Sequence, residues 1–99
     1  MTTKSHNGIP IRLPDERWAH ISEEHAELAD MQDQILDTVS KPERILAGST
    51  GEHLAVREIE AGKWLVVVYR ENDDDGFIIT AFLTRRGRSL DKRQVVWRS

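Results

Sequence analysis

The segment covering residues 63–86 constrains the fold most, because it holds most of the continuous apolar sequence in the chain. It predicts two β-strands joined by a short acidic turn. In the first strand, Lys63–Glu71, apolar residues occupy both alternating sets of positions, as in a central strand covered on both faces. In the second strand, Phe77–Arg85, alternation predicts one shared face for Ile78, Thr80, Phe82 and Thr84. The turn between them ends in Gly76, a residue available for positive φ.

Further elements are expected on the N-terminal side of this hairpin. Residues 9–13 predict a short strand, which Pro10 would place at a sheet edge. Residues 15–40 have helical apolar spacing and start after Pro14, a proline favoured at helix beginnings. No proline or glycine interrupts the segment, so one helix and two helices both stay open; we expect two helices, meeting between His25 and Asp30. Residues 44–48 and 53–59 predict two more strands.

This order predicts an α+β domain. A short N-terminal strand and one or two helices would pack on a four- to five-stranded antiparallel sheet. The 99 residues are expected to form a single domain, with residues 1–8 disordered. Residues 87–99 would form a basic tail or an edge element, in which Val95, Val96 and Trp97 add a strand or a short helix.

Composition excludes several classes of protein. The absence of cysteine excludes a disulfide framework and thiolate metal sites. Neither a signal peptide nor an apolar run long enough to span a bilayer is visible, so we expect a cytoplasmic protein without a membrane partner. No metal-ligand spacing and no glycine-rich phosphate loop occurs, and we expect no cofactor.

The charges of the chain are unevenly distributed, although the net charge of −3 argues against a general nucleic-acid binder. Residues 15–37 contain eight carboxylates and one arginine, whereas residues 85–98 contain six basic residues and one aspartate. This pattern predicts an acidic helical side and a basic C-terminal side. Two solvated surfaces of complementary charge, without a binding role, would explain the same pattern. The basic side includes Arg85, Arg86, Arg88, Lys92 and Arg93, which would contact the RNA backbone if the nuclease-like resemblance of the motifs below holds.

A few polar residues within apolar segments could carry chemistry. Histidine is the natural acid or base near neutral pH, but His20 and His25 would lie about 140° apart on one uninterrupted helix. A break near His25 would let its imidazole turn toward the sheet. Arg57 lies in a strand and should project to the open face or to a cleft edge. The alternative interpretations are that His20 is an ordinary surface residue and His25 a partly buried one. Thr80 and Thr84 could likewise be ordinary strand residues.

Several motifs, taken in order, resemble the phage and bacterial nuclease-like families of the barnase–EndoU–colicin–RelE (BECR) fold. They are WAHISEEHAEL at residues 18–28, then Arg57, LVVV at residues 65–68 and ITAFLT at residues 79–84. The resemblance covers about residues 9–86. The chain departs from the family pattern at Ala26, where proline is preferred, at Glu24, where a basic residue is common, and at Ala55, where tyrosine is expected.

The resemblance implies metal-independent cleavage of RNA, either tRNA or mRNA, by attack of the ribose 2′-hydroxyl on the adjacent phosphorus. It implies His20 and His25 as acid and base, Arg57 as the phosphate clamp, and Thr80 and Thr84 as hydrogen-bond donors. It also implies a toxin-type or phage-associated protein with a neutralising protein partner. The alternatives are a non-catalytic binding module on the same fold, or a toxin-neutralising protein whose acidic surface mimics nucleic acid.

Overall fold

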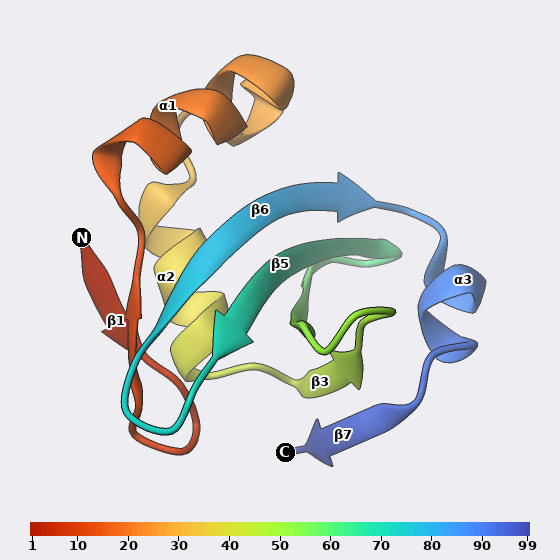
Figure 1. Ribbon diagram of the computed structural model, residues 1–99. Helices are drawn as coiled ribbons and strands as arrows, with labels where there is room; N and C mark the ends of the chain where they lie inside the picture. Colours follow the sequence, from red (N-terminus) through yellow and green to blue (C-terminus); the bar gives the residue numbers. More distant parts are fainter.

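The predicted hairpin lies in the middle of a seven-stranded sheet in the computed structural model, which describes residues 1–99. β5 (Lys63–Glu71) pairs antiparallel with β6 (Gly76–Thr84) and, on its other side, with β4 (His53–Glu60). β3 (Arg44–Ala47) continues this antiparallel meander beyond β4. The sheet order is β1-β2-β6-β5-β4-β3-β7, and its long strands curl (Figure 1). The predicted α+β class and the meander of four strands are confirmed.

The N-terminal end of the chain differs from the expectation of disorder. β1 (Thr2–Lys4) pairs antiparallel with β2 (Pro10–Arg12), and Ser5 between them is buried. β2 in turn pairs parallel with β6, so the sheet is mixed rather than antiparallel and has more strands than predicted. The short β2 carries the expected proline but lies inside the sheet, because β1 covers its outer edge.

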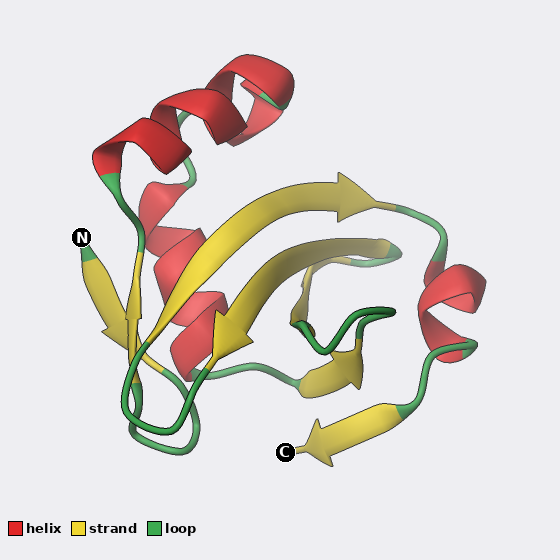
Figure 2. Cartoon of the chain, viewed as in Figure 1, coloured by secondary structure: helices red, strands yellow, loops and turns green.

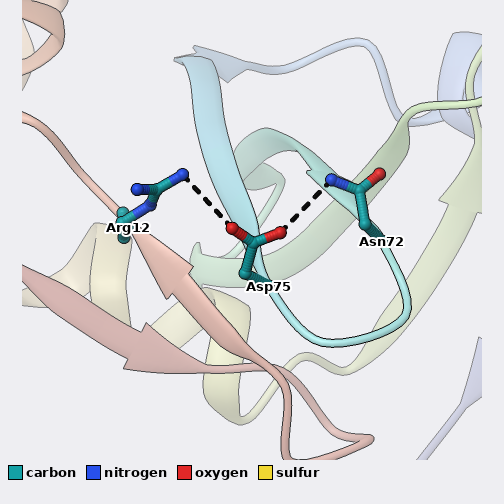
Figure 3. A network of polar contacts seen from close by, with 3 residues as sticks. All are labelled: Arg12, Asn72 and Asp75. Atoms are coloured by element: carbon teal, nitrogen blue, oxygen red, sulfur yellow. Dashed lines mark hydrogen bonds and ion pairs between the residues drawn. The ribbon is translucent and has the colours of Figure 1, made fainter.

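A polar contact joins β2 to the turn before β6 (Figure 3). The Asp75 carboxylate accepts hydrogen bonds from the Arg12 guanidinium and from the Asn72 side-chain amide, each at 3.4 Å. Gly76 is needed here for close approach, because a Cβ would collide with the Arg70 carbonyl and with Ile11 Cδ1. The predicted positive φ at Gly76 is wrong; in the neighbouring β4–β5 turn, Gly62 has a φ of +76°.

The helical segment divides into two helices, as expected. α1 (Asp15–Glu24) ends at His25, whose φ of −129° and ψ of 75° leave the helical region. A 3₁₀ turn, η1 (Ala26–Leu28), then leads to α2 (Gln32–Ser40). Ile21, Leu28 and Ile35 from these three elements are fully buried against the sheet. α1 and α2 therefore cover one face, which we call the helical face (Figure 2).

The C-terminal residues cover the opposite face. α3 (Gly87–Asp91) buries Leu90 against that side of the sheet, which we call the α3 face. The chain then forms β7 (Val95–Arg98), which pairs antiparallel with β3. Residues 87–99 are thus a short helix followed by an edge strand, and the strand alternative for Val95–Trp97 is confirmed. The ring centroids of Trp97 and His6, from the two ends of the sheet, lie 4.8 Å apart.

An irregularity in β6 changes which side chains share a face. The register shifts at the point where Val68 pairs with Thr80 and Tyr69 pairs with Ile78, so Ile79 is an extra residue. Ile78 consequently packs in the helical-face core, whereas Phe82 packs on the α3 face. The predicted common face for Ile78 and Thr80 is wrong, because strict alternation does not hold across a bulge.

The two faces of the sheet have separate cores. The helical-face core contains twelve buried residues, and the α3-face core contains five. β5 contributes to both, with Leu65, Val67 and Tyr69 on the helical face and Val66 on the α3 face. No helix combines the length and the apolar character that crossing a membrane would require.

Candidate functional site

Two of the predicted site residues, Thr84 and Arg85, lie at the end of β6 beside residues of two distant segments. Glu27, Lys63, Leu83, Thr84 and Arg85 line a hollow of about 200 Å³, which we call the η1–β6 hollow. Its floor is the apolar Leu83, and its rim is polar. The His25 imidazole adjoins this rim, with Nδ1 3.7 Å from the Glu27 carboxylate and a side chain that is 32% exposed.

Local structure explains why these residues gather. The helix break at His25 starts η1, which bends the chain over the ends of β5 and β6. Because Trp64 pairs with Thr84, the preceding Lys63 and the following Arg85 come to the same end of the ladder. Two cations, a carboxylate and a threonine thus line one opening, and the His25 imidazole lies beside the carboxylate. This set can bind an anionic group and exchange protons with it.

The hydroxyl of Thr84 has a defined orientation. Its Oγ1 accepts a hydrogen bond from the backbone N–H of Arg86 at 3.0 Å. A threonine hydroxyl also carries one donor proton. Since the N–H is the donor in this bond, the hydroxyl proton of Thr84 is available for a ligand.

His20 lies outside this hollow. It lines a separate polar depression with Pro14, Glu16 and Arg17 on the outer side of α1. Its Nε2 is 2.6 Å from the Glu24 carboxylate, one helical turn away, and its side chain is 53% exposed. The structure therefore does not bring the two predicted histidines into one site.

Arg57 occupies a third location. It shares the helical face of β4 with Ala55 and Ile59, and it projects to a cleft edge, one of the two predicted placements. The hollow that it lines holds about 230 Å³ and is completed by Gln34, Asp37, Thr38, Glu58 and Ile59. Two carboxylates in this set make the surroundings of the guanidinium unfavourable for a phosphate group.

Thr80 lies on the α3 face, opposite Arg57, because it pairs with Val68 on that side of the sheet. A further hollow of about 220 Å³ opens on this face. Its apolar floor consists of Leu54, Val68 and Phe82, and Arg93 lies at its rim. The loop between β3 and β4, residues 48–52, forms the remaining wall.

Hydrogen bonds hold the β3–β4 loop in place. The Glu52 carboxylate accepts bonds from the backbone N–H of Thr50 at 2.9 Å and from its hydroxyl at 2.7 Å. These bonds favour the ionised form and lower the pKa of Glu52 below its usual value. The Arg70 guanidinium donates to the Thr50 carbonyl at 3.1 Å, and Arg93 donates to the Ala47 carbonyl at 3.2 Å. The α3-face hollow thus has an ordered wall.

The predicted basic cluster lies on the surface around α3. All five of its members are exposed: Arg85, Arg86, Arg88, Lys92 and Arg93. Arg85 lines the η1–β6 hollow and Arg93 lines the α3-face hollow. The cluster therefore extends along the C-terminal segment from one opening to the other.

Sequence analysis missed Glu27 and Lys63 as site residues. Glu27 follows His25 by two residues, and a predicted helix break at His25 would have been the signal to consider the next polar side chain. Lys63 begins the strand that pairs with β6, so the hairpin register alone would have placed it near Arg85. Glu27 and Lys63 could have been found only by looking for the site at the end of the hairpin rather than at its middle.

No group of three or more His, Asp or Glu side chains is arranged to hold a metal ion. Comparisons with models of protein families, with curated proteins and with solved structures found no match to this chain. The function must therefore be argued from the geometry of the molecule itself.

Proposed function

We propose that this domain cleaves RNA by transesterification and that the η1–β6 hollow is its reaction site. The observation that carries the proposal is that one carboxylate, two cations and a threonine line one opening, with the His25 imidazole 3.7 Å from that carboxylate. The resemblance of the ordered sequence motifs to nuclease-like families supports the same reaction. The basic cluster around α3 supports an RNA backbone as the ligand.

The reaction requires a base, an acid and a stabiliser of negative charge. The Glu27 carboxylate takes the proton of the ribose 2′-hydroxyl, whose oxygen then attacks the adjacent phosphorus. Protonated His25 gives its proton to the 5′-oxygen as the bond from phosphorus to that oxygen breaks. The products are a 2′,3′-cyclic phosphate and a free 5′-hydroxyl, and solvent restores both side chains to their starting states.

The cations of the hollow act on the phosphate. The Arg85 guanidinium can contact two non-bridging oxygens at once, and the Lys63 ammonium adds a second positive charge. The Thr84 hydroxyl donates to the same group. Arg57, the phosphate clamp that the resemblance implies, has no such role in this proposal because Asp37 and Glu58 share its hollow.

An assay of RNA cleavage in EDTA tests the proposal. His25→Ala should slow cleavage at least about 100-fold, the typical contribution of an acid–base group, and Arg85→Ala by a similar factor. The matched control is His20→Ala, which removes the other histidine of the same helical segment and should change the rate less than about threefold. Wild-type protein that leaves RNA intact, or equal losses for both histidine variants, would refute the assignment.

Non-catalytic binding of single-stranded RNA is the second candidate, and the α3-face hollow favours it. Phe82 on the floor offers an aromatic surface for a base, and Arg93 at the rim offers a cation for the neighbouring phosphate. If RNA binds but stays intact, and Phe82→Ala weakens binding while His25→Ala does not, this second function replaces the first. A neutralising protein partner remains a proposal for either function.

A further inference from the structure

β7 leaves one side of its backbone without a partner strand. It ends the sheet order, with only β3 beside it (Figure 1). The N–H of Ser99 donates to the Glu43 carbonyl of the β3 side at 3.1 Å. Because backbone groups alternate in direction along an antiparallel ladder, the N–H and C=O of the preceding Arg98 point away from β3. The outer edge of β7 therefore offers free donors and acceptors.

The side chains of β7 are unusually apolar for an exposed edge. Val95 is 38% exposed and Val96 is 49% exposed, and the only other large exposed hydrophobic residue of the chain is Met1. Exposed edge strands normally carry charges, prolines or a covering segment that prevent pairing with another chain. Here Ile45 pairs with Trp97 and Leu46 with Val95, so Val96 is an extra residue at a register shift. Both valines are open to solvent, and the ring of Trp97 beyond them packs against His6.

The charges around this edge select the partner. Lys92, Arg93 and Arg98 flank the two valines, and all three are exposed. Antiparallel pairing of β7 with a second copy of itself would bring the same cations of both copies side by side, which is unfavourable. A strand that carries carboxylates would instead be attracted to them. Charge complementarity therefore argues for an acidic partner and against a second copy of this chain.

We propose that β7 binds an extended acidic segment of another protein as an eighth strand. The added strand would use main-chain hydrogen bonds for affinity, and its alternation of β-branched and acidic side chains would give specificity. Its apolar side chains would cover Val95 and Val96, and its carboxylates would face the flanking cations. This interaction uses the edge of the sheet and does not depend on the proposed RNA cleavage.

A synthetic peptide provides the test. The probe is a blocked octapeptide of alternating valine and glutamate, titrated into ¹⁵N-labelled full-length protein with amide chemical shifts as the readout. We expect shifts concentrated on β7, protection of the Arg98 amide from hydrogen exchange, and weaker binding at high salt. A peptide with lysine in place of glutamate, and one N-methylated at alternate residues, should both bind at least tenfold more weakly.

Two variants separate the proposed edge from the rest of the sheet. Val96→Glu places a carboxylate on the β7 edge, which repels the glutamate peptide, and should weaken its binding at least tenfold; Val96 is 49% exposed, so the fold should persist. The matched control, Thr2→Glu, places the same charge on β1 at the opposite edge and should have no effect. Shifts outside β7, equal binding of the lysine peptide, no binding, or a β7-dependent dimer seen by light scattering would each overturn the proposal.

Discussion

The helical face and the α3 face of the sheet are built differently although they share β5. On the helical face, α1 and α2 enclose twelve buried residues, and Leu65, Val67 and Tyr69 of β5 have no solvent exposure. On the α3 face, a helix of five residues adds Leu90 to four buried strand residues, and Phe82 and Val68 remain half-buried. One face is a complete core, whereas the other is partly open.

This difference leaves most of the open apolar surface on one face, whereas the η1–β6 hollow, with Leu83 of the helical face as its floor, opens only at the end of the strands. A sheet face covered by helices buries its strand side chains but leaves little apolar surface for a ligand. The partly open face keeps apolar surface beside exposed cations, the combination that nucleic acids and acidic segments recognise. The acidic helices and the basic α3 segment lie on opposite faces of the sheet. The charge asymmetry along the sequence therefore becomes a charge asymmetry between the two faces.

Truncation of the helical-face core should have the largest effect. Leu65→Ala removes a fully buried side chain from the helical-face side of β5, where α2 and its neighbours cannot collapse into the space. We expect a loss of about 4 kcal/mol in the free energy of unfolding. Chemical denaturation measures it, with Val95→Ala as an exposed control that should change stability by less than about 0.5 kcal/mol. A loss below about 1 kcal/mol would show that this face is not the main core.

The corresponding truncation on the α3 face should cost less. Leu90→Ala removes the main apolar contact of α3. The cost is limited because the short helix can shift into the space and because solvent already reaches the neighbouring side chains. We expect a loss of about 2 kcal/mol, the lower end for buried leucine, with increased hydrogen exchange confined to α3 and β7. If Leu90→Ala destabilised the protein as much as Leu65→Ala, the proposed difference between the faces would be wrong.

Removal of charge should affect binding on one face only. The double variant Arg86→Ala/Arg88→Ala deletes two exposed cations of the α3 side, and we expect about tenfold weaker binding of single-stranded RNA, or about 1.4 kcal/mol. The plot of log affinity against log salt concentration should also become shallower. The matched control, Arg17→Ala/Lys41→Ala, removes two cations from the helical side and should leave affinity unchanged. Equal losses would mean that charge acts without regard to its position.

The elements that local sequence determines could be predicted, and those set by long-range pairing could not. The β5–β6 hairpin follows from alternation and turn residues, whereas helical spacing in residues 15–40 was compatible with one helix as well as with the break at His25. The parallel contact of β2 with β6 joins segments more than 60 residues apart, and no local pattern indicates it. Ile79 is an ordinary strand residue by type, so the bulge that reverses the side of Ile78 has no signal in composition.

The candidate site, like the fold, could be predicted only in part. His25, Thr84 and Arg85 were predicted as functional residues and do gather, because each lies at an element end that the sequence indicated. His20 and Arg57 were predicted to join them but line other hollows. Their separation depends on how α1 and α2 are placed over the sheet, and that placement follows from packing of the whole core rather than from any motif.

The smallest expected effect tests whether polar groups inside the helical-face core limit its stability. Tyr69 is fully buried, its hydroxyl has no hydrogen-bond partner, and burial together with the nearby Glu71 carboxylate raises its pKa above the usual value near 10. Above that pH the unfolded chain loses the phenol proton while the folded protein keeps it, so the folded state is progressively destabilised as pH rises.

Tyr69→Phe should therefore change stability by less than about 1 kcal/mol at pH 7, because it removes a hydroxyl that gains no bond. It should also lose less stability than the wild type between pH 9 and pH 11, since phenylalanine does not titrate. Thermal unfolding of both proteins across this pH range measures the difference. A loss of several kcal/mol at neutral pH would mean that the hydroxyl is bonded, through a buried water, to Glu71, whose second carboxylate oxygen accepts from the Asn7 side chain at 2.8 Å. The helical face would then depend on a polar network as well as on apolar burial.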